Sequence, residues 1–145
     1  MSLTGWRANG WLREHRTSHS EIVKLLGAGD RDLADAATST LSTDRRHNIA
    51  YEAALKFATA ALAAAGYRAT RESHHLRTIE SLSLTIRADP ATVRRLDRAR
   101  QRRNVTEYEG GGMISEGEAG EAFRLAGQLR DRVRGWLEVE HPELM

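Results

Sequence analysis

The segment from residue 44 to residue 65 constrains the fold more than any other part of the chain. If it is helical, its apolar side chains lie almost all round the helix. They are Ile49, Ala50, Ala53, Ala54, Leu55, Phe57, Ala58, Ala61, Leu62 and Ala65. The polar residues recur at steps of three or four and form one narrow stripe: Asn48, Glu52, Lys56 and Thr59. A helix with so small a polar face is surrounded by others, so we predict a central helix that ends at Gly66, a common C-terminal cap.

The rest of the chain has the pattern of further helices. Ser18 and Ser115 are each followed three residues later by Glu, which is the spacing of a capping box. Pro90 favours the first turn of a helix. We predict helices over 18–40, 44–65, 71–87, 90–109 and 115–141, and no strand, because β-branched and aromatic residues nowhere alternate over a strand length. The expected fold is an all-α, single-domain, up-and-down bundle of about five helices over 18–141, preceded by a segment, 1–17, with the potential for a short helix.

Composition excludes several classes of protein. The chain has 145 residues and no cysteine, which excludes disulfides, zinc ribbons, iron–sulfur clusters and thiol chemistry. Its longest apolar run, 60–65, is far shorter than the ~20 residues of a membrane span. The first residues lack the basic and apolar segments of a secretory signal. We therefore expect a cytoplasmic protein that works without a membrane, a metal or a cofactor.

Charge is balanced overall but concentrated locally. Lys and Arg number 22 against 20 acidic residues, a net charge of +2, which is far from that of a protein that coats DNA. Seven arginines nevertheless fall within 87–103. Four of them face away from the predicted core and are candidates for contact with RNA phosphates: Arg94, Arg95, Arg98 and Arg102. A solvated helix face is the alternative interpretation, because no aromatic residue lies among them.

The inward face of the helix predicted over 90–109 begins with Val93 and Leu96 and then turns polar. The positions that continue it are Arg100, Arg103, Asn104 and Glu107, with Tyr108 at its edge. Burying such groups without partners is costly, so they must pair, border a cleft or lie at a subunit interface. One interpretation is a solvated helix end with Arg103 paired to Glu107. The other is a polar cleft lined by Arg103, Asn104 and Tyr108.

The sequence Arg-Arg-Asn-Val-Thr-Glu-Tyr at 102–108 resembles the signature of HEPN domains, in which an Arg, usually followed by Asn, precedes a His with four to six residues between the Arg and the His. The segments 44–55 and 66–82 resemble that family's second helix, following loop and third helix, and the resemblance covers 18–140. It implies a helical bundle that dimerises with its motifs facing across the interface. It also implies either a metal-independent RNase or a non-catalytic module that binds nucleotide or RNA. Many members pair with a small nucleotidyltransferase in toxin–antitoxin or defence systems.

The resemblance assigns roles to individual residues. Arg103 matches the family's Arg and Asn104 its usual neighbour, while Tyr108 stands where the His is expected. Cleavage of RNA through the ribose 2′-hydroxyl needs a group that moves a proton near neutral pH and a cation on the phosphorane. A phenol, with a pKa of about 10, is a poor base at neutral pH. His75 or His47 is the alternative source of an imidazole, if either reaches the cleft from a neighbouring helix.

Three functions are consistent with these residues. The first is a HEPN protein of a toxin–antitoxin or defence-type system, which forms a homodimer, pairs with a small nucleotidyltransferase, and binds nucleotide or RNA at the cleft. Arg100 and Glu107 are expected to line that cleft as well. The second is a metal-independent RNase toxin, in which Arg103 stabilises the phosphorane and Tyr108 or a nearby His moves the proton. The third is a non-catalytic helical module that binds a partner protein.

Overall fold

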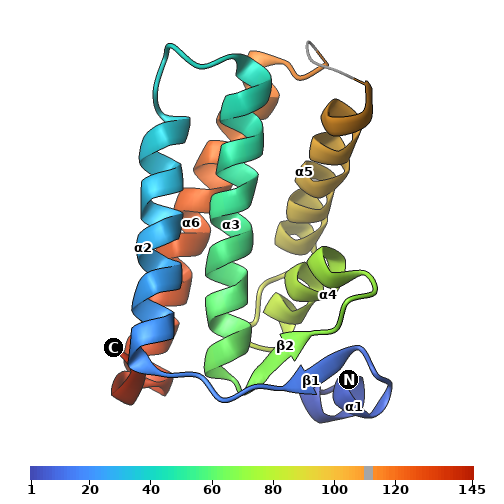
Figure 1. Cartoon of the computed structure of the whole chain (residues 1–145), viewed down its shortest axis with the longest axis vertical. Coiled ribbons are helices and arrows are strands. Elements are labelled where there is room, and N and C mark those ends of the chain that lie inside the picture. The colour runs from blue at the N-terminus through green and yellow to red at the C-terminus, as the bar shows by residue number, and fades with distance from the viewer. Residues whose placement is uncertain (110–112) are drawn as a thin grey trace.

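A computed structural model places four long helices around a common apolar core (Figure 1). It describes residues 1–109 and 113–145, and for 107–109 it describes the backbone alone. The long helices are α2 (His19–Ala36), α3 (Thr43–Ala64), α5 (Pro90–Glu109) and α6 (Glu116–Glu140). Of the described residues, 73% are helical, which confirms the predicted helical class.

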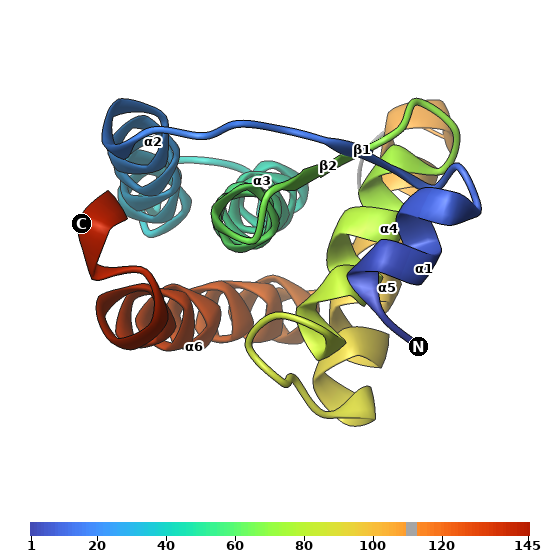
Figure 2. The same cartoon turned by 90° about the horizontal axis from the view of Figure 1, so that it is seen from below.

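The central position of α3 confirms the prediction made from its pattern. Seen from below, α3 lies between α2, α6 and the pair formed by α4 (His74–Glu80) and α5 (Figure 2). Its alanines are buried, and so is Phe57, which has no exposed surface. Phe57 faces Gly29 of α2, and a Cβ atom at Gly29 would lie 2.5 Å from the ring. The absence of a side chain at Gly29 therefore lets α2 approach α3 closely.

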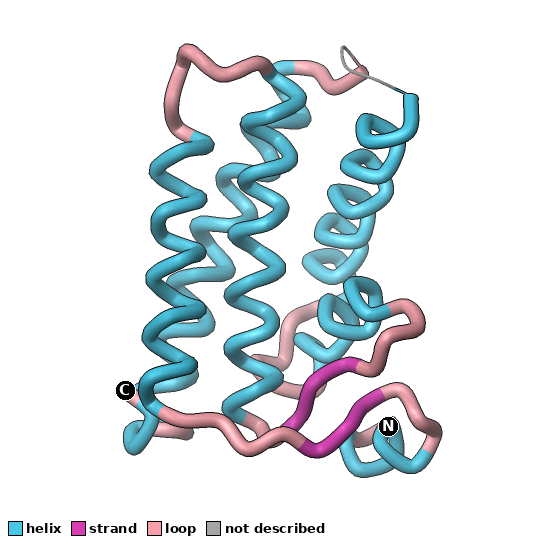
Figure 3. The backbone as a smooth tube through the Cα atoms, in the orientation of Figure 1, coloured by secondary structure: helices cyan, strands magenta, loops and turns pink. Residues whose placement is uncertain are grey.

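The two short strands show that the all-α prediction is wrong in one place. Residues 1–17 form α1 (Leu3–Ala8) and β1 (Leu12–Glu14), and β1 pairs in antiparallel fashion with β2 (Tyr67–Ala69) (Figure 3). Three residues are too few for an alternating pattern to be recognised in a sequence. The pairing carries the N-terminal segment onto the end of α3, where Trp6 is buried in a cluster with Leu62.

Two of the predicted helices are shorter in the structure. The helix expected over 71–87 is reduced to α4, followed by a 3-10 turn, η1 (Ser81–Ser83). Left-handed backbone at Ser73 (φ 53°) and Arg87 (φ 60°) interrupts a helix at either end. The helix expected over 18–40 ends at Ala36, because the Thr-Ser-Thr run that comes after it has low helix propensity. None of the described helices combines the length and the apolar composition that a membrane-spanning helix needs.

Candidate functional site

The candidate site is built around α5, whose buried face packs against α3. Leu96, Ala99 and Thr106 lie on that face. The described residues of the predicted cleft, together with His75 and His47, border three separate hollows around this face. We call these the α4–α5 pocket, the α3–α5 groove and the α5–α6 pocket, with volumes of about 260, 550 and 320 Å³.

Arg103 borders the α3–α5 groove, where α3 supplies its partners. Its Nη2 lies 2.8 Å from Glu52 Oε1, and its guanidinium lies 6.0 Å from the centre of the Tyr51 ring. The expectation that Arg103 faces inward and has a partner is thus met, with Glu52 as the partner. The side chains of Glu107 and Tyr108 lie outside the described residues, so the local Arg103–Glu107 pair and the proposed role of Tyr108 stay predictions.

Tyr51 links this groove to α4. Its hydroxyl lies 3.2 Å from His75 Nδ1. Burial, together with the charge of Glu52, raises the pKa of Tyr51 well above its ordinary value, so the phenol stays protonated. Burial, followed by the charge of Arg103, lowers the pKa of His75. His75 is therefore a neutral imidazole near pH 7, and one of its nitrogens is fixed by a buried tyrosine.

The α4–α5 pocket brings together three of the predicted residues: His75, Arg100 and Asn104. Arg100 is oriented by Asp97, whose Oδ1 lies 2.7 Å from Arg100 Nε. His74, which sequence reasoning did not select, also lines the pocket, and burial lowers its pKa. Among the described residues, neither the terminal nitrogens of Arg100 nor the amide of Asn104 has a hydrogen-bond partner. These N–H groups of Arg100 and Asn104 are therefore available to a ligand in the α4–α5 pocket.

The four arginines that were expected to face outward are not equivalent. Arg94, Arg95 and Arg98 are exposed, as predicted. Arg102 is instead half-buried against the start of α6, where its Nε lies 2.8 Å from Glu118 Oε2 and its Nη2 also bonds the Met113 carbonyl. Helical periodicity placed Arg102 on the solvent side, and this was wrong, because the capping box of α6 holds Glu118 within its reach.

The two candidate histidines lie in different places. His75 lines the α4–α5 pocket, whereas His47 lines the α5–α6 pocket with Arg95, Arg98 and Arg102. Only 2% of His47 is exposed. The described members of the set that the sequence suggested as one cleft are therefore divided among three hollows around one helix.

Tyr51 and Glu52 are the residues that sequence reasoning missed. Both lie on α3, and Glu52 belongs to the narrow polar stripe of that helix. That stripe was the available signal, because a polar residue on an otherwise buried helix needs a partner. Over the described part of the chain, no group of three or more His, Asp or Glu side chains is arranged to hold a metal ion.

Comparison with protein-family models finds no match to this chain, and comparison with curated proteins finds none either. The case for a function therefore rests on the residues of this chain and on their geometry.

Proposed function

We propose that this chain binds the phosphate group of a ribonucleotide, free or within an RNA strand, in the α4–α5 pocket. The observation that carries the proposal is the convergence of three side chains from two helices on one hollow: His75 from α4, and Arg100 and Asn104 from α5. The resemblance to HEPN domains supports it, because it assigns nucleotide or RNA binding to the same helix.

The chemistry of the pocket fits a phosphate ester. Arg100 Nε donates to Asp97 Oδ1, so the two terminal nitrogens of Arg100 remain available. These two nitrogens can donate to two phosphate oxygens in a bidentate arrangement. Asn104 adds an amide whose donors are unused among the described residues. Since Tyr51 holds Nδ1 of His75, Nε2 is the nitrogen that remains for a ligand. This combination offers charge for the phosphate and directed polar groups for a ribose.

The test is binding of a fluorescein-labelled single-stranded RNA, measured by fluorescence anisotropy at low salt. We expect Arg100→Gln to weaken binding about tenfold, which corresponds to the loss of one charge-assisted contact of ~1.4 kcal/mol. Arg31→Gln is the matched control, because it removes the same charge from an exposed position on α2. Equal affinities of the wild type, Arg100→Gln and Arg31→Gln for the RNA would contradict the proposal.

A second function, metal-independent cleavage of RNA, is favoured by the position of Tyr51 between His75 and Arg103: its hydroxyl lies 3.2 Å from His75 Nδ1, and its ring centre lies 6.0 Å from the Arg103 guanidinium. A neutral imidazole can accept the proton of a 2′-hydroxyl as its oxygen bonds to the phosphorus, and can return that proton to the 5′-oxygen as the bond from phosphorus to that oxygen breaks. A guanidinium can stabilise the phosphorane between these steps. The assay is incubation of purified protein with mixed RNA in EDTA, comparing the wild type with His75→Gln, Arg103→Ala and Tyr108→Phe. Cleavage that resists EDTA and is lost in His75→Gln supports this function, and intact RNA with every variant rejects it.

The resemblance also leads us to propose that the chain forms a homodimer and works with a small nucleotidyltransferase in a toxin–antitoxin or defence pair. Light scattering coupled to size-exclusion chromatography tests the first part. A monomeric mass at micromolar concentration contradicts it. Co-expression with the product of the neighbouring gene tests the second. Failure of the two proteins to co-purify would contradict the proposed pair with a nucleotidyltransferase.

A further inference from the structure

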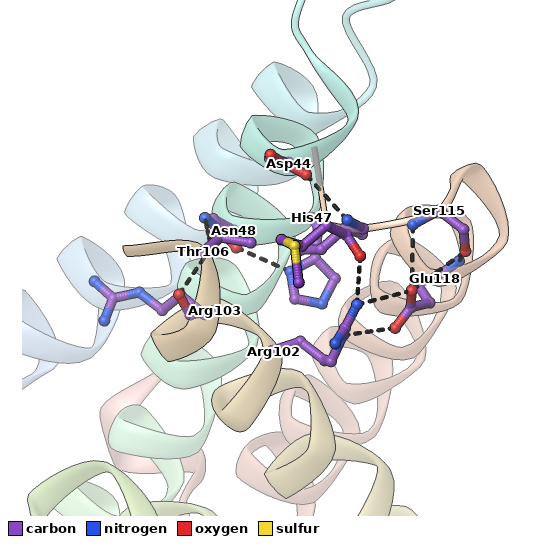
Figure 4. A network of polar contacts seen from close by, with 10 residues as sticks. Asp44, His47, Asn48, Arg102, Arg103, Thr106, Ser115 and Glu118 are labelled. Carbon is purple, nitrogen blue, oxygen red and sulfur yellow. Dashed lines mark hydrogen bonds and ion pairs between the residues drawn. The ribbon is translucent and has the colours of Figure 1, made fainter. Parts of the chain in front are cut away.

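The α5–α6 pocket is separate from the site proposed above and has its own chemistry. It lies between α5 and the first turns of α6, with a volume of about 320 Å³, within the usual range for a small-molecule site. Its wall includes three alkyl side chains, Ala99, Ala122 and Leu125, each nearly fully buried. Its polar groups are gathered from three helices, as Figure 4 shows for His47, Arg102 and Glu118.

The charges that line this pocket leave an unbalanced positive charge. Arg102 and Glu118 neutralise each other across a 2.8 Å contact. Glu121 is paired with Arg124, at 3.3 Å. The other two lining arginines have no ion pair among the described residues: they are Arg95 and Arg98. Two exposed guanidinium groups therefore stand at the pocket without an ion-pair partner among the described residues, which suits an anion.

A directed chain of hydrogen bonds sets the chemistry of His47 (Figure 4). The Thr106 hydroxyl donates to the carbonyl oxygen of Arg103, at 2.8 Å, so its oxygen is left to accept from Asn48 Nδ2, at 2.9 Å. The other end of that amide, Asn48 Oδ1, lies 2.9 Å from His47 Nδ1. Because an amide oxygen only accepts, Nδ1 of His47 carries the hydrogen.

The consequence is an acceptor nitrogen that no described protein group uses, on a residue that lines the pocket. In the neutral ring, a hydrogen on Nδ1 leaves Nε2 as an acceptor. Among the described residues, no hydrogen bond is made to Nε2, although His47 is only 2% exposed and lines the pocket. Nε2 is therefore free to accept from a ligand in the pocket that supplies an N–H or O–H.

We propose that the α5–α6 pocket binds a small organic anion with an apolar body. The anionic group lies at Arg95 and Arg98, the body lies against Ala99, Ala122 and Leu125, and an N–H or O–H at its far end donates to Nε2 of His47. A nucleoside monophosphate that carries an exocyclic amine has all three features. This proposal uses no residue of the α4–α5 pocket. A failure of RNA binding in the α4–α5 pocket would therefore leave it standing, and a failure of this proposal would leave RNA binding in the α4–α5 pocket standing.

The probe is adenosine 5′-monophosphate, titrated into the full chain by calorimetry, with adenosine and inorganic phosphate as partial ligands. We expect saturable binding of the monophosphate and at least tenfold weaker binding of either part. Arg98→Gln is expected to weaken binding about tenfold, a loss of ~1.4 kcal/mol. Arg94→Gln is the matched control, because Arg94 is exposed on the same helix and does not line this pocket.

The titration has three outcomes that overturn the proposal. They are no saturable binding, equal affinity for inorganic phosphate and the monophosphate, and equal affinity of Arg98→Gln and the wild type. Loss of binding in Arg100→Gln with no change in Arg98→Gln would move the ligand to the α4–α5 pocket.

A second measurement needs no variant. Long-range proton–nitrogen NMR spectra of the imidazoles report the tautomer directly. We expect His47 with its hydrogen on Nδ1 in the free protein, and a shift of Nε2 when the monophosphate is added. A hydrogen on Nε2 in the free protein would overturn the assigned tautomer, and with it the proposal.

Discussion

The contact between Gly29 and Phe57 makes the most quantitative prediction about this fold. A Cβ atom built on Gly29 lies 2.5 and 2.6 Å from two ring atoms of Phe57, whereas carbon atoms in contact are separated by about 3.5–4.0 Å. Gly29→Ala therefore forces the ring or α2 to move by about 1 Å. Overpacking of this kind costs about 1–3 kcal/mol. The contact matters for the site, because α3 carries His47, Tyr51 and Glu52.

Gly27→Ala provides the matched control. The two glycines lie two residues apart in α2, and a Cβ atom on Gly27 meets only the end of Arg31, at 3.7 Å. Both substitutions gain about 1 kcal/mol of helix propensity, and this gain cancels when the two variants are compared. We therefore expect Gly29→Ala to be less stable than Gly27→Ala by about 1–3 kcal/mol.

The assay is urea-induced unfolding followed by far-ultraviolet circular dichroism. Similar slopes for both variants would show that the midpoints report stability. Phe57→Leu in the Gly29→Ala background removes the crowding ring atoms, so the penalty of Gly29→Ala should shrink in that background. If the two alanine variants have the same free energy of unfolding, the close approach of α2 to α3 is wrong.

Three further predictions concern the site and the helix that borders it. The pKa of His75 is lower in the folded protein than its ordinary value of 6.5, so the unfolded chain takes up the proton first as the pH falls. The free energy of unfolding should therefore decrease between about pH 7 and about pH 5.5. His75→Gln should make this decrease smaller, as measured by urea unfolding at the two pH values. A double-mutant cycle of Arg103→Gln and Glu52→Gln should give a coupling of about 0.5–1 kcal/mol, and no coupling would contradict their ion pair. Ser115→Ala should cost about 1 kcal/mol in the same assay, because it removes the cap of α6.

Much of the helical framework was predictable because it rests on local signals. Ser18 and Ser115 cap α2 and α6, and Pro90 begins α5, as their positions in the sequence indicate. At Ser115 both halves of the capping box are formed. At Ser18 only the serine acts as the cap, because Glu21 bonds Thr17 and His15 instead. A capping motif thus fixes where a helix begins, whereas the partner of its glutamate depends on neighbours.

The arrangement around α5 was predictable only in part. Periodicity placed Arg103 towards the core, and the structure confirms this orientation. Periodicity could not predict that Arg102 forms an ion pair with Glu118 of α6. It also could not show that His75 and His47 reach different pockets, since that depends on where α4 ends and how α3 is rotated. Partners distant in the sequence decided each of these features.

The central claim is that the α4–α5 pocket binds a ribonucleotide phosphate. The most direct measurement is a proton–nitrogen NMR titration of the full chain with a short single-stranded RNA. We predict that the largest shifts fall on the backbone amides of 73–76 and on those of Arg100 and Asn104, and that they disappear in Arg100→Gln. Shifts confined to the α5–α6 pocket, or no shifts at saturating RNA, would contradict the claim.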